Sequence, residues 1–323
     1  MSELNFLTFF SQGYIPRAKL LSTSLSAHED NPSLSCCYLD LESKSAASQM
    51  ATKQIFSISE VVSSDPALSR AYRQRQGASA IFTAVPSIIL RALDGVRNGE
   101  LLIYLDADTF VFAPFEAIRE SMAGKSVGLF PHDFLKPFNL FLSRYGLFNA
   151  GAIVIRNDTE GRKFLSKWQS LCNSWCEDRY VNGKYSNQAY LTDLWKSAGK
   201  ELTVLGRLGA NVAPWNSGFF NTRATKSGVL HRGQRIIFFH FHGFEVLSGH
   251  FKVKHLRYMR VLGRKEIHEI YDDYIQKLEI EHEKQGIPLK KSARFQDSLG
   301  AKLFSLGLDV AGNLLGQKIR KKN

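Results

Sequence analysis

Short apolar runs rich in β-prone residues alternate with segments of helical periodicity along the first half of the chain. The runs cover residues 4–10, 33–39, 54–62 and 100–106. Helical spacing is found between them, at residues 15–29, 65–76 and 80–96. Pro86 lies inside the last of these segments and predicts that this helix begins late. Such alternation is typical of βαβ units, so the sequence predicts an α/β fold with a mainly parallel sheet.

The second half of the chain continues this pattern less regularly. We expect strands at residues 126–131 and 148–156, and helices at residues 160–175 and 186–195. A strongly β-prone run covers residues 234–244, and residues 265–284 predict an exposed, charged helix.

The composition is that of a soluble globular protein. The chain has 323 residues, of which 44% are hydrophobic and 22% charged. It contains no run of about twenty apolar residues that would span a membrane. The N-terminus lacks the basic start and long apolar run of a signal peptide. Four cysteines without a disulfide-like pattern fit the same reading, so we expect a cytoplasmic protein.

Half of the net charge of +12 lies in the C-terminal tail, where residues 286–323 carry eight basic and two acidic side chains. Apolar residues recur there at intervals of three or four, which predicts one apolar helical face. They are Leu299, Leu303, Leu306, Val310 and Leu314. A basic amphipathic segment can bind an anionic membrane, here through residues 289–323 on the inner face of the plasma membrane, or it can pack on the body of the protein.

Two carboxylates stand one residue apart in the stretch YLDADTFVF, residues 104–112. In extended chain Asp106 and Asp108 point to the same side, while Ala107 turns away. Carboxylate oxygens at the carboxyl end of a parallel strand are suited to Mg²⁺ or Mn²⁺ with a phosphate ligand. The alternative is that the two aspartates cap the following turn.

Other uses of an Asp-x-Asp pair fit this chain poorly. Haloacid dehalogenase-type phosphatases need Thr or Val where Phe110 stands, and nucleotidyltransferases need a preceding Gly-Ser turn. The phosphate-binding loop pattern G-x-x-x-x-G-K-[ST] does not occur. Acidic residues dilute the basic charge outside the tail and no nucleic-acid-binding module is recognisable, so we expect no nucleic-acid partner.

The ordered set of motifs resembles GT-A glycosyltransferases that use nucleotide-diphosphate sugars. YLDADTFVF looks like their D-x-D segment, and LFNAGAIVIRND is similar to the F-N-[AS]-G segment of glycosyltransferase family 8 and its bacterial relatives. YSNQAYLTDLW, NVAPWN and IIFFHFHGF follow in the order of the D-Q, A-P-W-N and H-x-x-G segments. The resemblance covers Leu4 to Phe244 and implies a GT-A fold, with a helical, basic C-terminal tail added to it.

The resemblance implies a metal site of Asp106, Asp108 and His240, where His240 is the histidine of H-x-x-G. His242 shares its strand face and is the alternative ligand. An imidazole ligand favours Mn²⁺ over Mg²⁺. Either histidine could instead be a hydrogen-bonded core residue.

The same resemblance implies the residues that bind the nucleotide sugar. Tyr14 matches the aromatic ring beside the base, and Asn149 and Gly151 match residues lining the sugar pocket, where glycine allows close approach of a ligand. Trp215 offers an apolar face for a sugar ring, or is a core tryptophan. Ala107 completes the donor-binding segment with Asp106 and Asp108.

Gln188 matches the glutamine beside the reacting sugar carbon, but Asn187 replaces the preceding aspartate. A family 8-like site implies retention of configuration without a strong protein base. An inverting site would need one, for which Asp133 is the candidate. The lysine after H-x-x-G is also missing, so four residues remain candidates for the phosphates. They are Arg73, Arg75, Lys252 and Lys254.

The sequence therefore predicts a GT-A domain at residues 1–262 and a helical, basic extension at residues 263–323. The implied function is metal-dependent transfer of a sugar from a nucleotide-diphosphate sugar, with UDP-sugars favoured, to a glycan, lipid-linked or other hydroxyl acceptor. The alternative is a sugar-nucleotide- or carbohydrate-binding protein of the same fold without catalysis.

Overall fold

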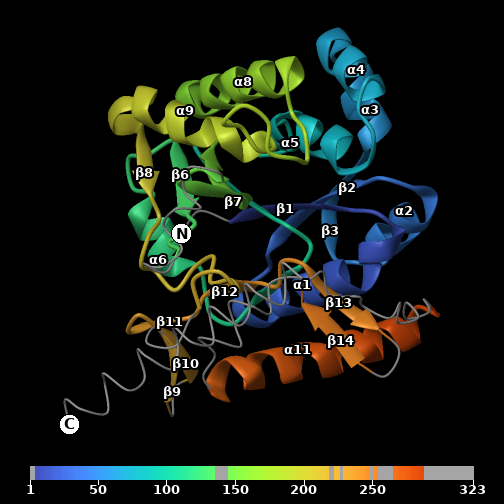
Figure 1. Ribbon diagram of the computed structural model, residues 1–323, viewed down its shortest axis with the longest axis vertical. Helices are drawn as coiled ribbons and strands as arrows, with labels where there is room; N and C mark the ends of the chain where they lie inside the picture. The colour runs from blue at the N-terminus through green and yellow to red at the C-terminus, as the bar shows by residue number, and fades with distance from the viewer. Residues whose placement is uncertain are drawn as a thin grey trace.

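A seven-stranded sheet forms the centre of the molecule (Figure 1). A computed structural model describes residues 4–134, 145–217, 222–225, 228–247, 250–253 and 265–286. The strands lie in the order β3-β2-β1-β4-β7-β6-β8. Their bounds are β1 Asn5–Phe10, β2 Ser33–Tyr38, β3 Thr52–Ser57, β4 Leu101–Leu105, β6 Val127–Pro131, β7 Phe148–Arg156 and β8 Leu202–Val204. Only β7 runs against its neighbours in this sheet, which confirms the predicted α/β class with a mainly parallel sheet.

Helices cover both faces of this sheet, and the side chains of β4 show why. Leu102 and Tyr104 enter one buried cluster, whereas Leu101, Ile103 and Leu105 enter the other, as expected for a strand buried on both faces. The first face is covered by α3 Ile58–Ser63, α4 Pro66–Arg73, α5 Gly77–Leu93, α8 Thr159–Ser174 and α9 Leu191–Ser197. The second is covered by α1 Ile15–His28, α2 Leu41–Ser48 and α6 Glu116–Ser121 (Figure 1).

Smaller elements lie beyond the main sheet. Antiparallel pairs join β5 Thr109–Val111 with β12 Phe238–His240, and β13 Phe244–Leu247 with β14 His250–Val253. A third small sheet joins β9 Thr222–Thr225, β10 Gly228–His231 and β11 Gln234–Arg235. Single 3-10 turns are η1 Gln12–Tyr14, η3 Asn187–Tyr190 and η4 Gly199–Glu201.

Helix α11, Lys265–Lys284, lies beyond α1 and beside β13 and β14 (Figure 1). Its apolar face contributes to a third buried cluster, with Tyr271, Tyr274 and Leu278 against residues of α1 and β12. The expectation of an exposed helix here is therefore wrong for this face. The predicted boundary after residue 262 stays a prediction, and the tail from residue 287 lies outside the described residues.

Two local predictions need correction. Residues 54–62 are not one strand, because β3 ends at Ser57, which caps α3 in a reciprocal capping box with Glu60. Pro86 does not delay its helix, since α5 begins at Gly77 and contains the proline. Burial of α5 between the sheet and α8 outweighs the roughly 3 kcal/mol that an internal proline costs.

Candidate metal and nucleotide-sugar site

The two aspartates follow β4 directly, at the carboxyl edge of the sheet. The backbone N–H of Asp106 donates to the carbonyl of Gly151 on β7 (2.8 Å), which holds the turn against the neighbouring strand. The N–H of Thr109 donates to the carbonyl of Asp106 (3.1 Å), so the chain turns before it enters β5. The Tyr104 hydroxyl donates to Asp106 Oδ1. Neither carboxylate caps a helix.

Pairing between β5 and β12 brings His240 to these carboxylates. His240 lies opposite Thr109, and the N–H of Phe241 donates to the carbonyl of Asp108 (2.8 Å). The imidazole Nε2 is 3.1 Å from Asp108 Oδ1 and 3.6 Å from Asp106 Oδ2. A histidine more than 130 positions further along the chain therefore converges on the two neighbouring aspartates.

Gly151 provides the room for this convergence. A Cβ atom at this position would lie 2.5 Å from His240 Cε1, 2.7 Å from Asp106 Oδ2 and 2.9 Å from Asn149 Oδ1. Real Cβ atoms do not tolerate such distances, so the cluster requires glycine here. The close approach predicted for Gly151 is therefore to protein groups of the cluster.

The pKa values show that the cluster favours positive charge at its centre. Burial raises the pKa of Asp106, and the repulsion of Asp108 adds to this effect. The attraction of His240 lowers the pKa but does not outweigh them. For Asp108, burial would raise the pKa, but His240 and, more weakly, Arg17 outweigh it and lower the pKa. Burial lowers the pKa of His240, and the attraction of Asp108 overcomes this and raises it. A divalent cation would supply the positive charge without a proton on the imidazole.

The donor set fits a transition-metal ion. His240 is only 1% exposed, and its Nδ1 has no hydrogen-bond partner within the described ranges. Ligand atoms of Asp108, His240 and His242 all lie within 4.8 Å of one another, with His242 exposed. Asp106 keeps 32% of its side chain exposed, so an oxygen remains accessible. The cluster can therefore be completed by either Asp106 or His242.

Trp215 lies buried beside the cluster. Its ring meets His240 and His242 edge to face, with centroids 5.7 and 5.6 Å apart, and meets His132 at 5.7 Å. Its Nε1 is buried without a hydrogen-bond partner in the part of the chain that the structure describes. The Trp215 ring therefore packs against both histidines. Its predicted role as an apolar face for a sugar ring stays a prediction.

Tyr14 and Arg17 lie where η1 passes into α1, after the carboxyl end of β1. Tyr14 is 45% exposed, and the Arg17 guanidinium carbon lies 5.0 Å from the centroid of its ring. The exposed ring is consistent with the predicted place beside a base. Arg17 was not predicted as a site residue, because no sequence motif marks a single arginine in the first turn of a helix.

Asn149, Asn187 and Gln188 are buried side chains with internal partners. Asn149 Oδ1 accepts the N–H of Gly151 (3.0 Å), so this side chain shapes the glycine turn. Gln188 Nε2 donates to the carbonyl of Tyr145 (3.1 Å), and Asn187 Oδ1 accepts from Ser186 (3.2 Å). Their roles at the reacting sugar remain predictions.

Asp133 has a specific partner. Its carboxylate accepts from the guanidinium of Arg232, which also donates to the Asp133 carbonyl (3.3 Å). The guanidinium therefore occupies an oxygen of this carboxylate. The role of Asp133 as the base of an inverting reaction stays a prediction.

Two of the four basic residues considered for phosphate binding have structural partners. Arg75 donates to Thr83 Oγ1 and to the carbonyls of Cys172 and Asn173, at 2.9 to 3.1 Å. Arg73 donates to the Ser69 carbonyl within α4 (3.2 Å). Lys252 lies opposite Glu245 in the β13–β14 pair, and Lys254 lies outside the described residues.

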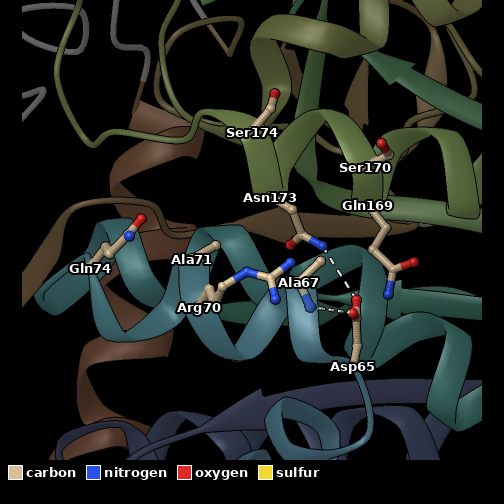
Figure 2. Close-up of a pocket in the computed structure, with 9 residues that line it drawn as sticks. All are labelled: Asp65, Ala67, Arg70, Ala71, Gln74, Gln169, Ser170, Asn173 and Ser174. Carbon is tan, nitrogen blue, oxygen red and sulfur yellow. Dashed lines mark hydrogen bonds between the residues drawn. The ribbon is translucent and has the colours of Figure 1, made fainter.

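A polar cavity of about 460 Å³ lies between α4 and α8 (Figure 2). Figure 2 shows Asn173 donating to Asp65, which also accepts the N–H of Ala67, at 3.3 and 2.8 Å. The cavity shares no residue with the Asp–His cluster.

No helix in the described part of the chain is long and apolar enough to span a bilayer.

No protein-family model matches the chain. Two curated proteins of Bacillus subtilis (strain 168), the uncharacterized proteins YfnF and YfnD, are each 24% identical to it over 277 residues. The alignment with YfnF covers 83% of this chain and 90% of YfnF, and that with YfnD covers 85% and 88%.

Solved structures similar to this chain are described as glycosyltransferases. Mouse xyloside xylosyltransferase 1 is 14% identical, with a TM-score of 0.48 over 74% of this chain and 97% of that chain. Galactosyltransferase LgtC, solved with donor and acceptor sugar analogues, is 13% identical, with a TM-score of 0.47 over 74% and 87%. GlyE of Streptococcus pneumoniae TIGR4 is 18% identical, with a TM-score of 0.42 over 65% and 46%.

Proposed function

We propose that the protein is a metal-dependent glycosyltransferase that takes a sugar from a nucleotide-diphosphate sugar, with a UDP-sugar favoured. The acceptor is a hydroxyl group of a glycan or of a lipid-linked glycan. One observation carries the proposal: Asp106, Asp108 and the buried His240 converge at the edge of the sheet where α/β proteins bind ligands, around a glycine that leaves them room. The ordered motifs of the sequence support it.

Asp106, Asp108 and His240 would hold the metal, and His242 is the alternative ligand. Manganese suits a site of two carboxylates and one imidazole better than magnesium does. When bound, the ion would neutralise the charge that develops on the departing nucleoside diphosphate. The protein groups position the ion, and Gly151 keeps its place free of side-chain atoms.

We propose that configuration is retained. Asn187 carries no acidic group, and Arg232 occupies an oxygen of Asp133, so neither offers a free carboxylate to the acceptor. The bond from the anomeric carbon to the phosphate oxygen would break on the face where the acceptor oxygen attacks. The acceptor proton would pass to the departing phosphate oxygen, which balances the reaction without a protein base.

A panel of nucleotide sugars tests the proposal. Purified protein is incubated with UDP-, GDP-, ADP-, CDP- and dTDP-sugars, with and without Mn²⁺, and binding and nucleotide release are measured separately. We expect release from one donor class only when the metal is present, and none from the Asp108→Asn variant. If a donor binds but no nucleotide is released, whether or not a glycan acceptor is added, the result would support the non-catalytic alternative instead. Absence of binding by every donor would contradict both.

A further inference from the structure

We propose that the indole N–H of Trp215 donates a hydrogen bond to an oxygen of the bound nucleotide-sugar donor. This inference rests on the proposed function, and it assigns Trp215 a polar contact, distinct from the predicted stacking of a sugar on its ring. Trp215 is 6% exposed, and its Nε1 is buried without a hydrogen-bond partner in the described ranges. Such a donor is costly, because it has lost its hydrogen bonds to water and gained none from the protein.

A tight turn fixes the backbone that carries Trp215. The N–H of Asn216 donates to the carbonyl of Ala213 (3.1 Å), and Pro214 takes the second position of this turn, which its fixed φ favours. Asn216 Oδ1 accepts the N–H of Ala213 (2.9 Å), and Nδ2 donates to the carbonyl of His132 (3.1 Å). The turn is therefore held by its own hydrogen bonds, and the indole is placed before a ligand binds.

Backbone and aromatic contacts place this indole at the metal site. The N–H of His240 donates to the carbonyl of Val212 (2.7 Å), three residues before Trp215. The centroid of the Trp215 ring lies 5.7 Å from that of His240 and 5.6 Å from that of His242, in edge-to-face arrangements. His240 Nε2 lies 3.1 Å from Asp108 Oδ1. The indole is therefore a direct neighbour of the groups that would hold the metal and the donor.

The chemistry of the indole limits what its partner can be. An indole N–H only donates, so the partner must be an acceptor. His240 would bind the ion through Nε2, which faces the aspartates, so its ring proton would lie on Nδ1 and this nitrogen could not accept. His242 is exposed, and rotation of this one side chain would let a ligand reach the indole. Phosphate and sugar oxygens of the donor both accept hydrogen bonds, and either would satisfy Trp215.

The test measures ligand binding by protein that lacks this N–H. Calorimetry with saturating Mn²⁺ gives the Kd of UDP, GDP, ADP, CDP and dTDP, and of their glucose and galactose derivatives, for wild type and Trp215→Phe. A second variant carries β-(3-benzothienyl)alanine at position 215, in which sulfur replaces the N–H and the bicyclic ring is kept. Trp195→Phe is the matched control, because it removes an indole from α9, where the ring packs against Phe148.

We expect both variants at position 215 to weaken the ligand that wild type binds best by at least fivefold. The control should change it less than twofold. Equal losses for the nucleoside diphosphate and its sugar derivatives would assign the bond to a phosphate oxygen, and a loss confined to the sugar derivatives would assign it to the sugar. In a ¹⁵N spectrum of the four tryptophans, the indole signal that Trp215→Phe removes should move downfield when this ligand is added with Mg²⁺.

Four results would overturn the inference. Unchanged affinity in the sulfur variant would do so even if Trp215→Phe binds weakly, because the ring and not the N–H would then bind the ligand. Equal loss in Trp195→Phe would show a general effect of the smaller ring. A parallel loss of Mn²⁺ affinity in the sulfur variant would show that Trp215 acts through His240. If wild type bound none of the ligands, the proposed function would fail and the inference with it, whereas the first three results leave the function standing. Should Trp215→Phe not fold, the sulfur variant decides.

Discussion

At the scale of single residues, Gly151 leaves the room in which Asp106 and His240 approach one another. Alanine there would push against the His240 ring and the Asp106 carboxylate, at 2.5 and 2.7 Å. We therefore predict that Gly151→Ala weakens Mn²⁺ binding at least tenfold, as measured by calorimetry. Gly128→Ala is the matched control, because its Cβ would meet the apolar side chains of Leu205 and Met122 instead. An equal loss in both variants would show general strain and contradict the assignment.

The two histidines differ in burial, and we therefore expect them to contribute unequally to Mn²⁺ binding. His240 is enclosed and lies 3.1 Å from Asp108, whereas His242 is exposed. We predict that His240→Ala raises the Mn²⁺ concentration for half-maximal activity more than tenfold, or about 1.4 kcal/mol, and more than His242→Ala does. Titration of each variant with Mn²⁺ measures this. The opposite order would make His242 the principal ligand.

The sequence could indicate the residues that a motif marks. Asp106, Asp108 and His240 follow from the ordered motifs, and the structure brings them together. It could not indicate that Arg17 helps to lower the pKa of Asp108, because the two residues come near each other only through the fold. The pairing of Asp133 with Arg232 is equally invisible, since the two are 99 positions apart and meet only through the fold.

At the scale of elements, local signals predicted most strands and helices, and packing decided the exceptions. The alternation of apolar runs gave β1, β2 and β4 because strands buried on both faces are continuously apolar. Helix α5 keeps Pro86 in its interior because tertiary burial outweighs its local cost. Ser57 and Glu60 do carry a readable capping signal, which the apolar character of residues 54–62 obscured.

Helix α11 packs through its buried face on α1 and β12, and the strength of this packing can be measured. Leu278 is fully buried, whereas Ile280 on the same helix is 49% exposed. We predict that Leu278→Ala lowers the free energy of unfolding by about 2–5 kcal/mol, and that Ile280→Ala changes it by less than about 0.5 kcal/mol. Urea unfolding followed by fluorescence measures both. Equal effects would contradict the packing, and a separate transition would support the predicted boundary after residue 262.

At the scale of the whole molecule, the basic tail has a role that is predicted from the sequence alone, because the tail lies outside the described residues. Each Lys or Arg near an anionic surface contributes about 1 kcal/mol, so the tail would hold an enzyme close to a lipid-linked acceptor. We predict that the full chain sediments with anionic vesicles at low salt and that deletion of residues 289–323 abolishes this. Neutral vesicles are the control. Failure of the full chain to bind, or equal binding after the deletion, would contradict the membrane role.

The central claim is that Asp106 and Asp108 hold a metal ion on which transfer of the sugar depends. Its most direct test is the rate of sugar transfer by Asp106→Asn and Asp108→Asn at saturating Mn²⁺, with circular dichroism to show that both variants are folded. Each substitution removes one negative ligand and keeps the size of the side chain. The account predicts that each variant retains less than about a tenth of the wild-type rate, a loss above about 1.4 kcal/mol. Retention of more than a tenth by either folded variant would contradict the assignment.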